Sequence, residues 1–320
     1  MKKSSKIILL LSAILISLGL ILTIGGLASG VQIERILQDG IWNVTLYEET
    51  PENDFSSSGR YSISSADIQQ LSVSWLDGSI TIEPYDGNEI LIEESSSEEI
   101  NQKNHLGFTT QDGVLRIFEC AKTVTVHFFW NQPTLRKDLH LYLPVDLAQS
   151  LDCLDLDTAD SSINIRGLHM KSLTLDTVDG DITVQDSVID TLHAETADAS
   201  LLLQGSQLQT LSWDNLNGDI TLAASSVDTL EISTMGGNLL GDLLSCPQSI
   251  QFDSLSGNLE LQLPADSQFT ATWNNFDGAY SSNFQGTYGN GTHTVGDGSA
   301  KISMDTMDGR LHIFTQDAPA

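Results

Sequence analysis

Basic side chains are scarce in this chain of 320 residues, which has 14 lysines and arginines against 43 aspartates and glutamates. Three of the lysines lie within the first six residues, and residues 1–30 contain no acid, so residues 31–320 carry a formal charge of −32. Such a charge repels polyanions, and it excludes nucleic acid as a partner. It attracts cations and basic partners instead.

Cysteine is also rare, and Cys120, Cys153 and Cys246 lie at spacings that match no metal-ligand motif. A Cys120–Cys153 bridge in an exported protein is one interpretation, and small buried hydrophobic side chains are the other. Catalytic motifs are lacking too, because no metalloprotease helix, nucleophile elbow or phosphate loop occurs. Helical periodicity is nearly absent after residue 30, which favours an all-β fold.

The one long hydrophobic run covers Ile7 to Ala28, 22 residues without a charge. As a helix it would span about 33 Å, enough to cross a bilayer. Lysines before it, and none soon after it, predict a single-pass cell-membrane protein with a cytoplasmic N-terminus and an extracytoplasmic C-terminal domain. A cleaved secretory signal ending at Gly26-Leu27-Ala28 is the alternative, and it exports residues 31–320 as well.

A repeat of 19 or 20 residues dominates the second half of the chain. LTLDTVDGDITV at residues 173–184 shows the pattern, in which apolar alternation, a polar turn and apolar alternation follow one another. Two outlying units, from Leu71 and Ile302, fit the same template. The regular units start at Leu154, Leu173, Leu192, Leu211, Leu230, Ile250 and Phe269.

Each repeat predicts two strands of about five residues, which are too few to enclose a core unless units stack on one another. We therefore expect a β-solenoid with two strands per coil, and a meandering β-sandwich is the alternative. The predicted organisation is a cytoplasmic tip and transmembrane anchor at 1–30, a juxtamembrane linker at 31–60 and a β-repeat domain at 61–317. The regular repeats cover residues 154–280.

Acidic turns recur along the repeats and are the first candidate site. In stacked coils they would form a carboxylate ladder able to bind Ca²⁺, and the sequence indicates no other cofactor. Turn chemistry is the competing explanation, because Gly180, Gly218, Gly237 and Gly257 supply positive φ, and Asp tolerates the adjacent left-handed position. The ladder residues are Asp160, Asp179, Asp181, Asp198 and Asp219.

Aromatic residues gather in HFFWNQP, where Phe128, Phe129 and Trp130 form a candidate binding patch. Packing in the core or at a cap of the solenoid is the alternative for these side chains. An exposed patch would dock a protein or a glycan at the cell envelope.

The order of several motifs resembles the DUF4097 family of candidate adhesins of bacterial envelopes. These motifs are LSVSWLDGSITIEPYDGNEILIEES at 71–95, LYLP at 141–144, LELQLPADSQF at 259–269 and the closing ISMDTMDGRLHI. The resemblance covers roughly residues 61–315. It implies an exported β-helix-like domain, often behind an N-terminal membrane segment in Gram-positive bacteria, and it brings no catalytic residues. Ser161 and Ala199 depart from the pattern, because they replace the turn glycine.

These observations predict a membrane-anchored extracytoplasmic binding module of adhesin type, without catalytic activity. A regulatory partner of a neighbouring membrane protein, or a sensor of envelope stress, is the first alternative. A polysaccharide-cleaving enzyme is the second, and it lacks a pair of carboxylates singled out by an unusual setting.

Overall fold

The computed structural model describes residues 42–44, 59–100, 105–119, 124–126, 136–275 and 279–316. The predicted transmembrane segment Ile7–Ala28 and the aromatic patch Phe128, Phe129 and Trp130 lie outside these residues. Within them, no helix combines the length and the apolar character needed to cross a bilayer. Most of the described residues, 68%, lie in strands and almost none in helices, as the alternating pattern predicts.

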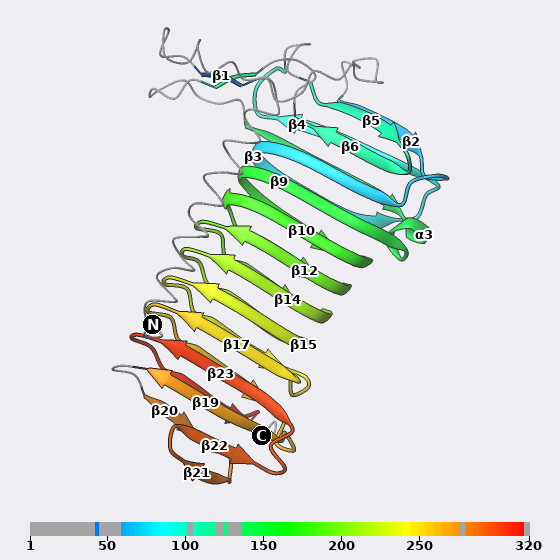
Figure 1. Cartoon of the computed structure of the whole chain (residues 1–320). Coiled ribbons are helices and arrows are strands. Elements are labelled where there is room, and N and C mark those ends of the chain that lie inside the picture. Colours follow the sequence, from blue (N-terminus) through cyan, green and yellow to red (C-terminus); the bar gives the residue numbers. More distant parts are fainter. Residues whose placement is uncertain are drawn as a thin grey trace.

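The strands form a long stack of coils with two faces, each face being a sheet of mainly parallel strands (Figure 1). In spatial order the first sheet contains β5 (Gly107–Gln111), β6 (Val114–Phe118), β3 (Gln70–Tyr85), β9 (Leu151–Arg166), β10 (His169–Asp179), β12 (Val188–Thr196), β14 (Gln207–Asn215), β15 (Ile220–Thr234), β17 (Ser249–Ser254), β23 (Ala300–Thr306), β19 (Phe269–Asn275), β22 (Thr292–Val295) and β21 (Thr287–Gly289).

The second sheet lies behind the first, and β3, β9 and β15 pass through a corner to take part in both. It contains β2 (Arg60–Ser64), β4 (Glu89–Ser96), β8 (Lys137–Pro144), β3, β9, β11 (Ile182–Gln185), β13 (Leu201–Gln204), β15, β16 (Leu239–Leu243), β18 (Leu259–Leu263), β24 (Leu311–Thr315) and β20 (Tyr280–Ser282). The remaining elements are α3 (Val145–Ala148) and the antiparallel pair β1 (Trp42–Val44) and β7 (Val124–Val126).

The register equals the sequence repeat. Leu173 on β10 pairs with Leu154 on one side and with Leu192 on the other, so each strand lies one 19-residue coil from its neighbour. Parallel pairing at this spacing is the arrangement of a β-solenoid with two strands per coil. The meandering β-sandwich, which needs antiparallel hairpins, is therefore wrong for the repeats.

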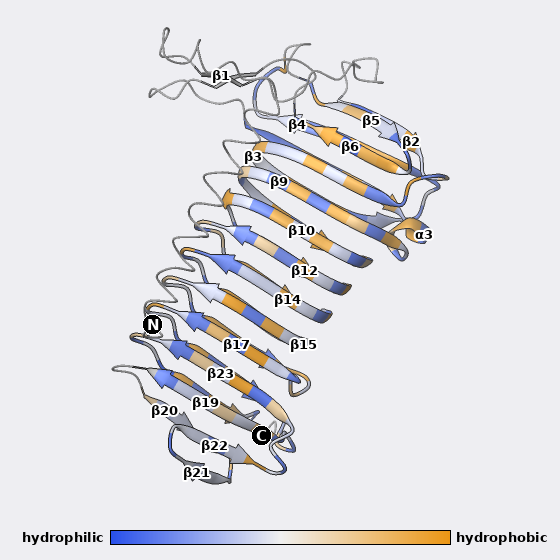
Figure 2. Cartoon of the chain, in the orientation of Figure 1, coloured by the Kyte–Doolittle hydropathy of each residue, from blue (hydrophilic) through white to orange (hydrophobic). Residues whose placement is uncertain are grey.

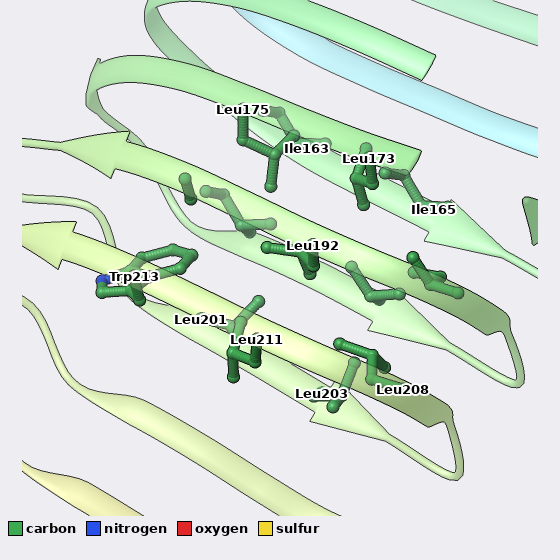
Figure 3. Packing of buried hydrophobic residues seen from close by; sticks show 14 of the residues in the cluster. Ile163, Ile165, Leu173, Leu175, Leu192, Leu201, Leu203, Leu208, Leu211 and Trp213 are labelled. Carbon is green, nitrogen blue, oxygen red and sulfur yellow. The ribbon is translucent and has the colours of Figure 1, made fainter. Parts of the chain in front are cut away.

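Alternate side chains of both sheets fill the space between them, and hydropathy alternates along each strand (Figure 2). Leu173, Leu192 and Leu211 of the first sheet face side chains such as Leu201 and Leu203 of the second (Figure 3). All five are almost completely buried. Stacking therefore provides the core that one coil lacks.

The first corner of most coils carries a buried hydroxyl or amide side chain, and Trp75 takes this position on β3. Thr158 and Thr177 stack through a hydrogen bond of 2.7 Å between their Oγ1 atoms, and the Oγ1 of Thr177 also donates to the carbonyl of Asp179 at 2.9 Å. Further along, the backbone N–H of Gly237 donates to Oγ1 of Thr234 at 2.9 Å. These side chains satisfy corner backbone groups that the sheet ladder leaves unpaired.

Glycine is needed at this corner for more than one reason. Gly180 and Gly218 have φ of +115° and +118°, and a Cβ at Gly218 would lie 2.1 Å from the carbonyl oxygen of Ala199. Positive φ was also expected at Gly237 and Gly257, and this is wrong, because neither lies in the left-handed region. There a Cβ would lie 2.1 Å from the carbonyl oxygen of the coil below, so close approach excludes a side chain.

At each end of the stack, strand order differs from chain order. The outlying unit at Leu71 lies on β3, between the later strands β8 and β9 in the second sheet. The unit at Ile302 lies on β23, between β17 and β19. Antiparallel strands then close the ends, with β4 against β8 and β22 against β19. Such caps keep open parallel edges from pairing with other chains.

Candidate binding surface

The predicted carboxylate ladder is partly assembled by the coils. Asp160 and Asp179 are register partners at the first corner, and Asp77 pairs with Asp160 from the other side. Asp198 occupies the same corner of the next coil, where its N–H donates to the carbonyl of Val178 at 2.9 Å. Asp181 and Asp219 lie two coils apart, with Ser200 between them.

Hydrogen bonds at the corners, within one coil or between neighbouring coils, occupy one oxygen of several of these carboxylates. Asp179 Oδ1 accepts the N–H of Gly180 at 2.7 Å, and Asp198 Oδ1 accepts from the amide of Asn217 at 2.9 Å. Asp219 Oδ1 accepts both the backbone N–H and the side-chain amide of Asn238, each at 2.9 Å. Within the part of the chain that the structure describes, no three His, Cys, Asp or Glu side chains are grouped as metal ligands. Calcium binding stays a prediction.

The cysteines contribute no described bridge, because Cys153 and Cys246 are free and Cys120 lies outside the described residues. Burial raises the pKa of the Cys153 thiol and of the Cys246 thiol. A raised thiol pKa lowers the thiolate fraction at neutral pH, so neither side chain is poised as a nucleophile.

A second line of acids, which the turn-based prediction missed, lies on the outer face of the first sheet. We call Asp157, Asp176, Glu195 and Asp214 the outer carboxylate column. They are successive register partners on β9, β10, β12 and β14. Neighbouring strands are about 4.8 Å apart, so each carboxylate faces the next at close range.

Burial and neighbouring acids together make two members of the outer carboxylate column harder to ionise. Partial burial, with smaller contributions from Glu195, Asp157 and Asp155, raises the pKa of Asp176 to about 6. Burial and then Asp155 raise the pKa of Asp157 in the same direction. His193, on the same outer face, lowers the pKa of Asp176 slightly, and its Nε2 lies 3.7 Å from Glu195. The column is therefore under-neutralised.

The sequence did contain a signal for this column. The fourth residue of the aligned units is acidic in LDLD, LTLD, LHAE, LSWD, IQFD and ISMD. The predicted ladder used the acids beside the turn glycines. The fourth residue of each unit lies instead on a strand of the first sheet and faces outward. Parallel stacking then aligns it from coil to coil.

A different group of charges is buried inside the N-terminal coils. Glu94 Oε1 lies 2.7 Å from Lys137 Nζ, and Glu94 Oε2 lies 2.8 Å from Nδ1 of His105. The N–H of Leu106 donates to Glu94 Oε1 at 2.9 Å, and Lys137 Nζ lies 5.0 Å from the ring centroid of Trp75. Each charge is thus paired within the protein, as burial requires.

Glu119 borders this buried group through its backbone and its side chain. Its carbonyl accepts a hydrogen bond from Lys137 Nζ, and its Oε2 accepts the N–H of Leu76 at 2.5 Å. Burial raises the pKa of the Glu119 carboxyl, and the nearby Lys137 charge opposes this shift. The arrangement is an internal network that joins β3, β4 and β8.

Aromatic side chains pack at the opposite end of the stack. Tyr280 stacks on Trp273 with ring centroids 4.1 Å apart, and Tyr288 stacks on His293 at the same separation. The Tyr280 hydroxyl is 2.5 Å from Nδ1 of His293, whose ring is fully buried. Burial raises the pKa of Tyr280 to about 12 and lowers that of His293. Both rings are therefore neutral near pH 7.

Solved structures of similar proteins include three candidate adhesins. The one from Parabacteroides distasonis ATCC 8503 has 16% identity and a TM-score of 0.43, over 80% of this chain and 96% of that one. The one from Parabacteroides merdae ATCC 43184 has 11% identity and a TM-score of 0.41, over 81% and 95%. The one from Bacteroides fragilis NCTC 9343 has 11% identity and a TM-score of 0.37, over 80% and 95%.

No curated protein matches the chain. The model of the Toastrack DUF4097 family matches residues 68–313, which is most of the sequence and nearly all of the stacked coils. The chain is a member of the Toastrack DUF4097 family.

Proposed function

We propose that the protein is an extracytoplasmic binding module of adhesin type, held at the cell membrane by a helix at Ile7–Ala28, and that it has no catalytic activity. The hydrophobic run and its flanking lysines support the anchor. Family membership supports the export of the stacked domain. The partner is a basic protein or glycan of the envelope or of a neighbouring surface.

The outer carboxylate column is the observation that carries this proposal. Asp157, Asp176, Glu195 and Asp214 lie in register on an open sheet face. Burial first, and then the neighbouring acids, raise the pKa of Asp176 to about 6, and like charges at this spacing repel one another. Such repulsion opposes folding, so the column contributes nothing to stability at neutral pH. A positively charged partner would relieve it and would be steered toward it over long range.

The buried charges support binding over catalysis. Glu94 is fully engaged by Lys137, His105 and the N–H of Leu106, and its side chain is 0% exposed. A general acid or base must reach the proton that it transfers in the substrate. This buried carboxylate instead holds the terminal coils together.

The test uses the full chain in zwitterionic lipid nanodiscs, with poly-lysine, dextran and poly-glutamate as probes. We expect poly-lysine to bind in a salt-sensitive manner, and dextran and poly-glutamate to bind far more weakly. The triple variant Asp157→Asn, Asp176→Asn and Asp214→Asn should lower the association rate about tenfold, since rim charges act mainly on that rate.

A matched triple variant removes three exposed charges elsewhere, at Asp112, Glu260 and Asp266. Equal losses in both variants would mean that net charge alone binds poly-lysine, and the outer carboxylate column would then have no special role. Cross-linking in the native membrane is the second measurement. Recovery of one neighbouring membrane protein, joined through residues away from this column, would replace adhesion by the regulatory alternative.

A further inference from the structure

An apolar residue follows the buried corner side chain in eight stacked coils. We call these residues the corner stripe. Hydrogen bonds align them directly, because the N–H of Leu216 donates to the carbonyl of Ala197 at 3.2 Å and that of Met307 donates to Leu255 at 3.3 Å. In spatial order the corner stripe consists of Leu76, Ala159, Val178, Ala197, Leu216, Met235, Leu255 and Met307.

The core does not account for this apolar character. Val178 and Met307 are 48% and 43% exposed, and the other six are half-buried. The residue just before each is a buried Thr, Ser, Asn or Trp, and the residue after it is Asp, Asn, Ser or Gly. Turns of this kind ordinarily take polar residues. The stripe residues range in size from Ala to Met, and what they share is their apolar character. Close packing against a fixed neighbour would instead demand a common shape.

Carboxylates flank the corner stripe on both sides. Two residues before the stripe residue, the outer face carries the outer carboxylate column. Ser233 interrupts the line of acids after Asp214, and Asp253 and Asp305 resume it further along the stack. One residue after it, the corner carries Asp77, Asp160, Asp179, Asp198 and Asp308. A ligand on the stripe therefore needs an apolar centre and positive charge along both edges. Anionic lipid surfaces do not meet this requirement.

The spacing of the stripe selects among extended ligands. Neighbouring coils are about 4.8 Å apart, and an α-helix advances about 5.4 Å per turn. The side chains on one face of the helix therefore stay within about half a coil spacing of the matching stripe residues over about four coils. An extended strand repeats its side chains on one face every ~6.7 Å, which loses register after one or two coils. Eight stripe residues span about 34 Å, the length of a helix of about 22 residues.

We propose that the corner stripe docks a basic amphipathic α-helix of a partner protein, with the helix axis parallel to the stack. Apolar side chains of the helix rest on Val178, Leu216 and Met235, and lysines or arginines along its two flanks pair with the adjacent carboxylates. This is helix-in-groove recognition transferred to the ridge of a solenoid. The inference rests on the proposed binding function and names its partner class.

The test measures binding of a synthetic 22-residue peptide to the full chain in zwitterionic nanodiscs, with empty nanodiscs as the blank. The peptide carries leucine at i, i+3, i+4 and i+7 and lysine on both flanks of that face. A scrambled peptide of the same composition has the same charge and no apolar face. We expect the helical peptide to bind at least tenfold more tightly than the scrambled one and to gain helical circular dichroism on binding.

Substitutions then locate the site. The variant Val178→Ser, Leu216→Ser and Met235→Ser should weaken binding of the helical peptide at least tenfold. Leu240→Ser is the control, because Leu240 has the same 48% exposure as Val178 and lies on β16 of the other sheet. Unfolding in urea is recorded for each variant, and only variants with an unchanged transition are compared; a destabilised triple variant is replaced by Val178→Ser alone.

Unchanged affinity after loss of the stripe residues, or equal affinity for the two peptides, overturns the helix-docking inference. If poly-lysine still binds through the outer carboxylate column in that case, the proposed function survives without it. If poly-lysine also fails to bind, the proposed function fails as well. The two failures are thereby distinguished.

Discussion

Lys137 Nζ lies 2.7 Å from Glu94 Oε1 in the terminal coil, and the two side chains are 1% and 0% exposed. A buried ion pair of this kind adds little stability compared with an apolar replacement. Removing one partner, however, leaves the other charge buried without a partner or water, which is strongly destabilising. The pair joins β8 to β4, the antiparallel strand that covers that end of the second sheet. The cap should therefore fail first when the pair is broken.

Lys137→Met should lower the free energy of unfolding of the cap by about 3–5 kcal/mol. Amide hydrogen exchange at β4 and β8 measures this loss. The double variant Lys137→Met with Glu94→Gln should lose less than the sum of the two single variants, since neither charge is then left alone. Glu93→Gln is the control, because Glu93 pairs at 3.1 Å with an Arg60 that is 70% exposed, and about 1 kcal/mol or less is expected there. Additive losses would contradict a direct pairing.

Asp176→Asn should stabilise the protein at pH 7.5 and should have no such effect near pH 4. The pKa of Asp176 is raised to about 6 by burial and neighbouring acids, so the folded state holds the proton more tightly than the unfolded state. Stability is then lost as pH rises from about 4 to about 6. Discounting for solvent exposure, we expect a gain of about 1 kcal/mol. Urea titrations at the two pH values measure it, with Glu260→Gln as the control. An equal gain at both pH values would contradict a raised pKa of Asp176.

Acid should loosen the C-terminal cap through His293. Burial lowers its pKa, and the groups facing it are the Tyr280 hydroxyl, the stacked Tyr288 ring and the edge of Phe269. The unfolded state therefore takes up a proton first, so the stability that the neutral ring provides is lost as pH falls from about 6.5 through the lowered pKa.

Hydrogen exchange at β19 and β22 should speed up over that pH range in the native protein. His293→Phe should exchange faster at pH 7.5, because Tyr280 loses its hydrogen-bond partner, and should lack the additional acid-dependent step. If the step persists in His293→Phe, another group causes it.

Deletion of one whole coil should be tolerated. Removing residues 192–210 places Leu211 where Leu192 had paired with Leu173, so the core, the corner threonines and the strand register all continue. A nearest-neighbour stack loses one coil and one interface by this change. Removing residues 192–201 breaks the register and should unfold the repeats. Circular dichroism and thermal melting compare the two deletions. Loss of the fold in both would show that coils are not interchangeable.

Much of the proposed binding surface could be predicted from the sequence, given that the 19-residue coils stack in parallel. The acid at the fourth residue of each unit and the apolar residue at the corner both recur at the repeat spacing. Which side of the strand each position faces follows from alternation. Acids beside the turns, such as Asp179 and Asp219, instead accept backbone N–H groups through Oδ1, from the same corner for Asp179 and from the next coil for Asp219. Sequence position alone does not distinguish an acid that closes a turn from one that faces solvent.

The buried network could not be read in the same way. Glu94, His105 and Lys137 belong to segments far from the regular repeats, and no spacing links them. Their meeting depends on β4 folding back against β8, which is an antiparallel cap outside the repeat. Long-range pairing of this kind is set by the whole chain.

The sequence by itself determined the 19-residue period, the two strands of each coil and the corners between them, because local alternation and turn residues express these features directly. The tertiary structure alone decided that the strands pair in parallel, that β3 lies between β8 and β9, and that β23 lies between β17 and β19. The reason is physical. The apolar face of a strand can be buried by any neighbouring strand with the same alternation of side chains. Which strands become neighbours therefore depends on which arrangement also closes both ends of the stack.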